Sequence, residues 1–391
     1  MRTTLPTIGF CENGAGYGGA IISLAAFLEH ISPAYQPCLY TSLGTTQYQR
    51  LASLLPWTHV PPWTLMPPER IRRAGLPFAS SIDNVLNVLP TALRYYHHFK
   101  RARIDLVYLN NDANCNMAAA LAARMAGLPM VLHARGFNNP TRGTRWVLAK
   151  LSHCIAVSHA VRDELVELGL PREKCSVVPE GLDLDRFCPR PPAPGLRHEL
   201  GMGEHEPVIT LVGGLVDWKG QDVLLDAAPA ILERFPRAHI LIVGAAYGRD
   251  REFAEMLAQR AAAPGLGGRV RLLGARGDIP DLLSISDIVL HTSTKPEPFG
   301  RTFLEGMAMG KAVIASNEGG PLDVIEHEVD GLLIAPRQPA LLAGAVIGLL
   351  SDPQLAADMA ARGALKARAF SIQSHAAQIN AVLAAALHAP R

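Results

Sequence analysis

The sequence predicts an α/β protein made of two doubly wound domains, each a parallel sheet covered by helices on both faces. Short apolar runs rich in β-branched residues alternate along the whole chain with longer segments of helical period. Runs that are apolar at nearly every residue are typical of parallel sheets buried between helices. Two such series follow each other, and 391 residues are enough for two domains of ordinary size.

Each expected strand is a short apolar run bounded by turn-forming residues. In the first half of the chain the runs lie at residues 7–10, 38–41, 105–109, 130–133, 154–157 and 176–178. In the second half they lie at residues 208–212, 239–243, 269–273, 287–290, 312–315 and 331–334. The periodicity of residues 221–235 predicts an amphipathic helix, whose apolar face holds Val223, Leu224, Ala227, Ala228, Ile231, Leu232 and Phe235.

A proline-dense stretch separates the two series. Residues 187–203 read FCPRPPAPGLRHELGMG, and proline discourages both helix and sheet, so this stretch is the expected linker. In open α/β sheets, ligands bind beyond the C-terminal ends of the strands. The residues that carry chemistry are therefore expected in the loops that follow strands.

Composition excludes several classes of protein. The net charge is only +2 and the sequence shows no nucleic-acid-binding motif, so we expect no nucleic-acid partner. The six cysteines are scattered without a C-x-x-C pair, which favours free thiols in a reducing compartment. The apolar runs fall short of the roughly 20 residues that span a bilayer, and the N-terminus does not read as a signal peptide. We therefore expect a cytoplasmic protein, soluble or peripheral on a membrane.

A glycine-rich turn, residues 13–20, follows the first expected strand and precedes an apolar helix. Gly16, Gly18 and Gly19 permit close approach of the backbone, and the helix N-terminus offers free N–H groups to an anion. The acidic residue of a dinucleotide-binding fold is missing, because the second strand ends in Leu39-Tyr40-Thr41. Two interpretations stay open: contact with a phosphate or substrate, and a purely structural turn.

A lysine follows the strand at residues 208–212, in the turn Gly213-Gly-Leu-Val-Asp-Trp-Lys-Gly220. Lys219 stands directly before the predicted helix, where an ammonium is unfavourable beside the positive end of the helix dipole unless an anion lies between them. This placement predicts a diphosphate at Lys219. A solvated lysine in a plain turn is the alternative.

The segment EPFGRTFLE, residues 297–305, carries a carboxylate on either side of an expected helix start. The flanking prolines keep Glu297 extended, and a helix that begins near residue 300 or 301 would hold Glu305 about one turn inside it. A diphosphate could then bind between a carboxylate that holds a sugar hydroxyl and one that holds a ribose. Its expected donors belong to Phe299, Gly300, Arg301 and Thr302.

Two other interpretations of the same segment stay open. Glu305 could complement a helix dipole while Glu297 is solvated. The two carboxylates could instead form a hydrolase pair, which needs them about 5–9.5 Å apart across one glycosidic bond. An anion site between the carboxylates disfavours the hydrolase pair. Farther on, the loop SNEGGP, residues 316–321, fits either a plain turn or a loop lying against the site.

With these motifs the chain resembles the retaining glycosyltransferases of family four, which have the GT-B architecture of two Rossmann-like domains facing a cleft. The resemblance covers nearly the whole chain and is most specific from residue 211 to residue 336. The matching segments are WKG (218–220), EPFGRTFLEGMAMGKAVIAS (297–316), EGGP (318–321), DGLLIAP (330–336), CIAVSHAVRDEL (154–165) and VVPEGLDLDRFCP (177–189).

The resemblance implies a role for each candidate residue. Glu297 would hold hydroxyls of the donor sugar, Glu305 would hold the nucleotide ribose, and Lys219 would neutralise the leaving diphosphate. His133 matches the family's histidine near the reacting sugar, although a lone histidine is by itself more often structural. The glycines at positions 16, 18 and 19 would face the phosphate or the acceptor.

The resemblance also assigns the domains and the activity. Residues 1–185 would form the acceptor-side domain, residues 186–370 the nucleotide-sugar-binding domain, and residues 371–391 a helix that crosses back onto the first. The implied reaction is retaining, metal-independent transfer of a hexose-type sugar from a UDP-, GDP- or ADP-linked donor to a glycan or lipid-linked acceptor, in polysaccharide or glycoconjugate synthesis. The sequence has no His/Cys/Asp cluster at metal-ligand spacing, so we expect no metal and no other cofactor.

Two positions depart from the family pattern. Gly214, in the donor-binding turn, stands where the family often has an arginine that assists the diphosphate, and Glu180 stands where it has an asparagine. The glycine keeps one alternative open, a binding or scaffold subunit that has lost catalysis. A different GT-B enzyme, such as a nucleotide-sugar hydrolase or a phosphorylase, is a further alternative.

Basic and aromatic residues are concentrated in residues 89–103, LPTALRYYHHFKRAR. Arg70, Arg72 and Arg73 add positive charge to the same domain. Such a mixture suits an anionic membrane surface and predicts a peripheral contact with the inner face of the membrane. An ordinary solvated helix is the alternative.

Overall fold

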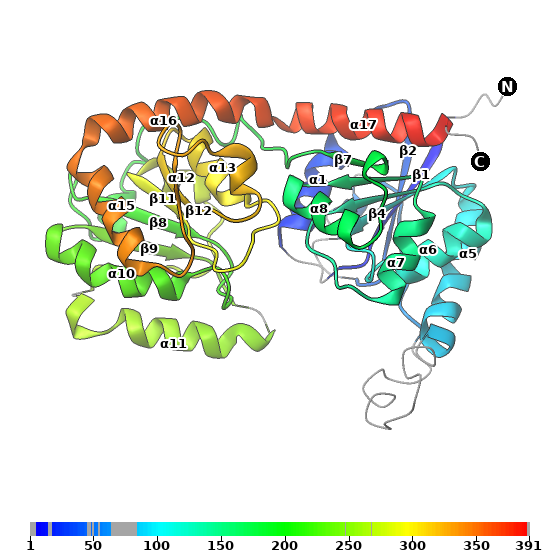
Figure 1. Ribbon diagram of the computed structural model, residues 1–391, viewed down its shortest axis with the longest axis horizontal. Coiled ribbons are helices and arrows are strands. Elements are labelled where there is room, and N and C mark those ends of the chain that lie inside the picture. The colour runs from blue at the N-terminus through cyan, green and yellow to red at the C-terminus, as the bar shows by residue number, and fades with distance from the viewer. Residues whose placement is uncertain are drawn as a thin grey trace. The chain divides into compact units, whose positions relative to one another are not determined.

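A computed structural model describes residues 5–14, 18–44, 48, 51–53, 55–63, 84–246, 248–266 and 268–388. The chain divides into two compact units, one of residues 1–181 and 372–391 and one of residues 182–371 (Figure 1). Residues 182–185, expected in the first domain, belong to the second unit.

The first unit holds a parallel sheet of seven strands in the order β3-β2-β1-β4-β5-β6-β7. The strands are β1 Thr7–Glu12, β2 Gln36–Thr41, β3 Trp57–His59, β4 Leu106–Asn111, β5 Met130–Ala134, β6 His153–Ala156 and β7 Cys175–Val177. No strand was expected at β3. This edge strand is only 3 residues long and none of them is buried, so it leaves no apolar run to recognise.

The described helices of the first unit are α1 Gly19–Glu29, α5 Leu89–Ala102, α6 Met117–Ala126, α7 Arg142–Lys150, α8 His159–Glu167 and α17 Ile372–His388. Helices α1 and α17 contact each other and share one core cluster with Phe10, Leu39 and Tyr108 of the sheet. Helix α5 packs on the opposite face, where the rings of Phe99 and Tyr40 lie 5.4 Å apart. The C-terminal helix therefore completes the core of the first unit.

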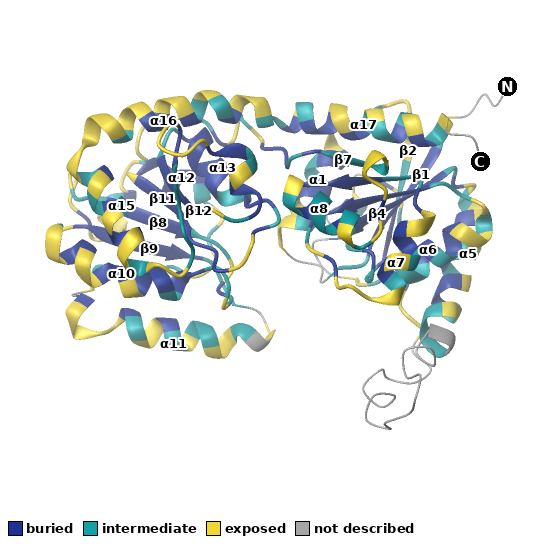
Figure 2. Cartoon of the chain, viewed as in Figure 1, coloured by how far each residue is buried: buried dark blue, intermediate teal, exposed yellow. Residues whose placement is uncertain are grey.

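The second unit holds a parallel sheet of six strands in the order β10-β9-β8-β11-β12-β13. The strands are β8 Val208–Val212, β9 His239–Val243, β10 Val270–Leu272, β11 Ile288–His291, β12 Ala312–Ser316 and β13 Leu332–Ile334. All of them were expected. All but the edge strands β10 and β13 are buried on both faces and are continuous apolar runs in the sequence (Figure 2).

The α-helices of the second unit are α9 Leu196–Glu199, α10 Gln221–Arg234, α11 Arg251–Ala261, α12 Ile279–Ser284, α13 Arg301–Ala308, α14 Pro321–Val324, α15 Pro339–Ser351 and α16 Pro353–Ala367. Shorter helical turns occur in both units. The first unit has the π-helical turn Asn84–Val88 and the 3-10 turn Arg172–Lys174, and the second has the 3-10 turns Gly248–Asp250, Pro264–Leu266 and Arg368–Phe370. Among the described residues no single helix is long and apolar enough to cross a membrane. Helix α15 and the segment from α16 to Phe370 are together long and apolar enough to span a membrane, by length and composition only. The two are bent by 101° relative to each other.

The linker expected at residues 187–203 is wrong in its second part. Residues 196–199 form helix α9, and Leu196, Leu200 and Met202 are buried against Val208 and Leu241 of the sheet. The prolines precede this segment, so they do not prevent its leucines from packing. The stretch is therefore part of the second unit's core.

In both sheets the strand order reverses next to the first strand of the unit. β1 lies between β2 and β4, and β8 lies between β9 and β11. Ligands of doubly wound folds bind at such a switch point, beyond the C-terminal ends of the strands. In the second unit the loops at this point are the one after β8, which contains Lys219, and the one after β11, which contains Glu297.

Candidate functional site

A partly buried ion pair joins the two loops at the switch point of the second unit. Lys219 Nζ lies 2.6 Å from Glu297 Oε2, and the same oxygen accepts a hydrogen bond from Ser293 Oγ at 2.8 Å. His291 Nε2 lies 3.3 Å from it. Among the described residues, every hydrogen bond and ion pair of the Glu297 carboxylate falls on Oε2, which leaves Oε1 available to a ligand hydroxyl.

The surroundings of Glu297 keep its carboxylate ionised. Burial raises its pKa, but the charge of Lys219 and the contact with His291 outweigh burial, so the pKa of Glu297 lies well below its usual range. The Lys219 ammonium also lies 4.2 Å from the centre of the Trp218 ring. Trp218 and Glu297 together fix a long, flexible lysine side chain in one place.

Glycines allow these two loops to touch. Gly220 has a φ of 72°, and a Cβ there would overlap the carbonyl of Thr292. The Thr292 hydroxyl donates to the carbonyl of Lys219 at 3.1 Å. The loop that carries Lys219 therefore rests directly on the start of the loop that carries Glu297.

Helix α13 begins where the sequence analysis expected it, at Arg301. Its N-cap is Gly300, with φ 93° and ψ 68°, and no side chain caps the first turn. A Cβ at Gly300 would lie 2.7 Å from His291 Nε2, so only glycine fits. The amides of this turn, next to Phe299 and Thr302, can therefore receive an anion.

Glu305 lies inside helix α13, on the other side of its N-terminus from Glu297. Its carboxylate is buried, and Arg301 Nε is 3.9 Å away. Burial raises the pKa of Glu305 although the charges of Arg301 and Arg186 act in the opposite direction. The order carboxylate, uncapped helix start, carboxylate is the one that the spacing of EPFGRTFLE predicts.

The loop SNEGGP lies against this segment rather than forming a plain turn. Gly319 pairs with Glu297 as an isolated bridge, and the Gly320 N–H donates to the Glu297 carbonyl at 2.8 Å. A Cβ on either glycine would overlap the backbone of Glu297 or Phe299. The two glycines thus hold the extended backbone that presents Glu297.

Gly214 differs from these glycines. Its φ is not positive, and a Cβ there would meet only the Ala245 carbonyl, at an ordinary contact distance of 3.8 Å. The backbone at this position therefore accepts a side chain. The departure from the family's arginine is a loss of charge and not a steric requirement.

The candidate residues of the first unit are less well placed to contact a ligand. Gly18 has a φ of 95° and caps α1, which begins at Gly19, while Gly16 lies outside the described residues. His133 lies within β5 and is 0% exposed. Tyr108 forms a hydrogen bond with its Nδ1, and the His375 ring lies 5.9 Å away.

The burial of His133 argues against a direct contact with a ligand. Burial, helped by the charges of Arg135 and His375, lowers the pKa of His133 well below its usual range. The ring lies on the face of β5 that α17 covers, and the sequence alone did not reveal which face that is. Ser293 and His291 were not among the expected site residues, because their role depends on the path of the chain at the end of β11 and in the loop after it.

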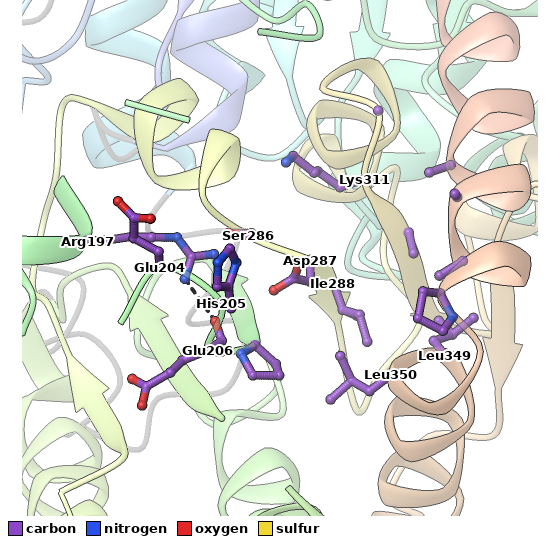
Figure 3. Close-up of a pocket in the computed structure, with 17 residues that line it drawn as sticks. Arg197, Glu204, His205, Glu206, Ser286, Asp287, Ile288, Lys311, Leu349 and Leu350 are labelled. Atoms are coloured by element: carbon purple, nitrogen blue, oxygen red, sulfur yellow. Dashed lines mark hydrogen bonds between the residues drawn. The ribbon is translucent and has the colours of Figure 1, made fainter. Parts of the chain in front are cut away.

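A cavity of about 500 Å³ lies in the second unit, at the ends of the strands opposite to the Lys219 and Glu297 loops. Figure 3 shows Arg197, Asp287 and Lys311 around it, with Leu349 and Leu350 on its far wall. Asp287 and Lys311 directly precede β11 and β12, so the cavity lies at the N-terminal ends of the strands. It is separate from the loops that carry the motif residues. Among the described residues, no group of three or more His, Cys, Asp or Glu is arranged to hold a metal ion.

Two family models match the chain. The model for glycosyl transferases group 1 matches residues 195–366, and the model for Glycosyltransferase Family 4 matches residues 51–186. The first covers every candidate residue of the second unit. Together the two models span most of the chain.

Curated relatives are similar over part of their length. A D-inositol 3-phosphate glycosyltransferase of Nocardia farcinica is 32% identical over 276 residues, which are 69% of this chain and 59% of that protein. A GDP-mannose-dependent alpha-(1-6)-phosphatidylinositol monomannoside mannosyltransferase of Mycobacterium tuberculosis is 32% identical over 216 residues, 53% of this chain and 54% of that one. The chain thus spans little more than half the length of these relatives.

Solved structures match over almost the full chain. Anabaena Alr3699/HepE in complex with UDP and glucose has a TM-score of 0.80 and 26% identity, over 96% of this chain and 99% of that one. A glycosyltransferase from Rickettsia africae has a TM-score of 0.83 and 22% identity, over 99% and 100%, which supports the fold alone. With two Rossmann-like parallel-sheet units of the GT-B type and both family models matched, this chain belongs to the group 1 glycosyltransferases of family four.

Proposed function

We propose that this protein transfers a sugar from a nucleoside diphosphate-sugar to a hydroxyl of a glycan or lipid-linked acceptor. The observation that carries the proposal is the start of helix α13, which no side chain caps and which two buried carboxylates flank. An uncapped helix N-terminus attracts a diphosphate, and carboxylates bind the hydroxyls of a sugar and a ribose. The similarity to Anabaena HepE, solved with UDP and with UDP-glucose, supports the same class of donor.

Each residue of the site has a role in this proposal. The diphosphate lies on the amides of Gly300–Thr302, and Lys219 bridges it to Glu297. The Glu297 Oε1 atom accepts from a sugar hydroxyl, and Glu305 accepts from the ribose. His133 makes no direct contact with the donor in this scheme, because its ring is fully buried.

The chemical step depends on stabilising the leaving diphosphate. Amides and an ammonium that are already in place cost no reorganisation when negative charge develops on the leaving group. We propose that the acceptor attacks from the face that the diphosphate leaves, which retains the anomeric configuration, and that no metal takes part. NMR of the product tests retention, since an inverted anomer would exclude it. Equal rates with EDTA and with added Mg²⁺ are expected.

Donor binding is the first experiment. Thermal shift measurements without metal, against UDP, GDP, ADP and their sugars, should identify one nucleotide that stabilises the native protein but not Glu305→Ala. That result would identify the base and support the ribose role. If no nucleotide stabilises the protein at millimolar concentration, the proposal fails.

The rival proposal is a non-catalytic binding subunit, and Gly214 is the observation that favours it. Without the family's arginine, the diphosphate has one cation fewer. A protein that binds the nucleotide but turns over no donor, with acceptor or with water, would support this rival. Release of free sugar into water alone would instead identify a nucleotide-sugar hydrolase.

We further propose that helix α5 brings the protein to an anionic membrane, where a lipid-linked acceptor would lie. Leu89 and Leu93 are 40% and 50% exposed, on the helix that carries Lys100 and Arg101 in its last turn. Trp63 is 43% exposed and stacks under Arg94 at 4.5 Å. Arg70, Arg72 and Arg73 lie outside the described residues. Flotation with anionic but not neutral liposomes is expected, and its loss in Leu93→Glu would assign the helix.

A further inference from the structure

A chain of buried polar side chains in the first unit has no role in the proposed function so far. At its centre is Arg135, directly after β5, whose side chain is 1% exposed. Its Nη1 donates to Glu180 Oε1 and to Ser23 Oγ, both at 2.7 Å. Its Nε donates to Asn110 Oδ1 at 2.7 Å. One guanidinium therefore binds three groups that come from three different parts of the chain.

The contact with Asn110 continues to the start of the glycine-rich turn. Because Asn110 Oδ1 accepts from Arg135, its Nδ2 is turned toward Glu12 and donates to Oε2 of that carboxylate. Glu12, the last residue of β1, is 1% exposed, and its Oε1 accepts the N–H of Gly14 at 2.8 Å. Two side chains thus connect the guanidinium to the second residue of the turn.

The contact with Ser23 reaches the other end of the same turn. Ser23 lies in helix α1, which begins at Gly19, and it is fully buried. Its hydroxyl accepts from Arg135 and donates to Glu180 Oε2. Hydrogen bonds therefore connect both the start of the turn and the helix that follows it to the Arg135–Glu180 ion pair.

The start of the turn has little room to move. A Cβ at Gly14 would lie 2.7 Å from Glu12 Oε1 and would overlap the side-chain amide of Asn111. The side chain of Asn13 is held as well, since its Nδ2 donates to Asn116 Oδ1 at 3.0 Å and its Oδ1 accepts from Tyr95 at 2.7 Å.

The identity of Glu180 follows from Arg135. An asparagine, which the resembling family has at this position, could accept from the guanidinium but could not neutralise it. A buried charge that loses its partner is strongly destabilising, so a carboxylate at 180 and an arginine at 135 require each other. Glu12 is bridged to the guanidinium through Asn110, whereas Glu180 contacts it directly at 2.7 Å.

We propose that Arg135 and Glu180 are positioning residues, which act through Asn110, Glu12 and Ser23 to hold both ends of the glycine-rich turn. The proposal rests on the proposed function, and it takes this turn to contact the acceptor, one of the two contacts expected of it from the sequence. Neither residue touches the substrate, because both side chains are buried within the first unit. Their effect is on the geometry of Gly14 and of the start of α1.

Hydrogen exchange tests the positioning itself and needs no activity. In the full-length protein, Glu180→Gln and Arg135→Lys should speed exchange of the Gly14 amide about tenfold or more. The substitutions disturb the contacts through Asn110 that hold the Glu12 carboxylate, and so weaken the hydrogen bond from the Gly14 N–H to that carboxylate. Glu164→Gln is the matched control. Its carboxylate also accepts a backbone amide in the first unit, that of Asn138 at 2.8 Å, but it lies outside the chain of contacts. Unchanged exchange at Gly14 in both variants, or equally faster exchange across the whole unit, would overturn the proposal.

Kinetics then test whether the positioning matters to the reaction. We expect kcat to fall about tenfold in Glu180→Gln while the affinity for the nucleotide, whose proposed contacts lie in the second unit, is unchanged. Glu180→Asp, which keeps the charge, should recover part of the loss. Faster exchange at Gly14 with an unchanged kcat would contradict a role in the reaction. If the native protein neither binds a nucleotide nor transfers sugar, the proposed function fails, and the exchange experiment still decides the positioning.

Discussion

Lys219 Nζ and Glu297 Oε2 meet at 2.6 Å, although the two residues are 78 positions apart and follow different strands. The contact means that the cation proposed for the leaving group and the carboxylate proposed for the sugar are one electrostatic unit. A diphosphate beside Lys219 would share the ammonium with Glu297. Removing either partner therefore changes the charge that the other presents to the donor.

A double-mutant cycle on this pair should be strongly non-additive. Lys219→Met and Glu297→Gln are each expected to lower kcat by about 10²–10³, the usual loss when a preorganised group at a developing charge is removed. The double variant should be no more than about tenfold slower than the worse single variant, because residues that act as a unit do not contribute separately. Steady-state transfer rates measure this.

The matched control for that cycle is the ion pair between Lys366 and Asp330, in the same unit but on other elements. Lys366→Met should leave kcat unchanged. Independent roles for Lys219 and Glu297 would appear as losses that multiply in the double variant.

The pH dependence of stability should have opposite signs at the two carboxylates. The pKa of Glu297 is depressed below its ordinary 4.5, so its contribution to stability is present above that pH and is lost as the pH falls through the folded value. The difference in Tm between the native protein and Glu297→Gln should therefore shrink as the pH falls below 4.5. Thermal unfolding between about pH 3 and pH 8 measures this.

Glu305 supplies the opposite case. Its pKa is raised, so its contribution to stability is present below its ordinary 4.5 and is lost as the pH rises through the folded value. Glu305→Gln should gain Tm relative to the native protein as the pH rises. Parallel Tm curves for the native protein and both variants would refute these assignments.

Two glycines of the Lys219 loop should respond in opposite ways to substitution. Gly214→Arg should fold normally, because a Cβ there meets nothing closer than 3.8 Å, and should bind nucleoside diphosphates about tenfold more tightly through the added charge. Isothermal titration with UDP and GDP measures the affinity. Unchanged affinity for both would mean that an arginine at this position does not reach the diphosphate.

Gly220→Ala is the contrasting variant in the same loop. An alanine at position 220 would be strained at the φ of 72°, and its Cβ would overlap the Thr292 carbonyl. The two loops should therefore separate, which lowers both Tm and activity. A Gly220→Ala protein with native Tm and native kcat would show that the contact between the loops is not needed.

The sequence predicted those parts of the fold and the site that depend on local pattern. Strands such as β8 and β12 were found because each is a continuous apolar run, and Glu297, Glu305 and the start of α13 because their spacing lies within one short segment. Contacts between distant segments could not be predicted in this way. The pairing of Arg135 with Glu180, of Lys219 with Glu297 and of His133 with α17 depends on which loops and faces the fold brings together. The short strand β3 was missed because it is half-exposed.

The ribose role of Glu305 can be separated from a role in folding with two nucleotides. If Glu305 accepts from ribose hydroxyls, Glu305→Ala should bind the cognate nucleoside diphosphate about tenfold or more weakly, the usual effect of losing a hydrogen bond to a charged group. The native protein should bind the 2′,3′-dideoxy analogue about as weakly as the variant does, and the variant should not distinguish the two ligands. Isothermal titration of both ligands against both proteins completes the cycle. A variant that still prefers the ribose form by the native ratio would place the ribose away from Glu305 and would leave its buried carboxylate a purely structural part of helix α13.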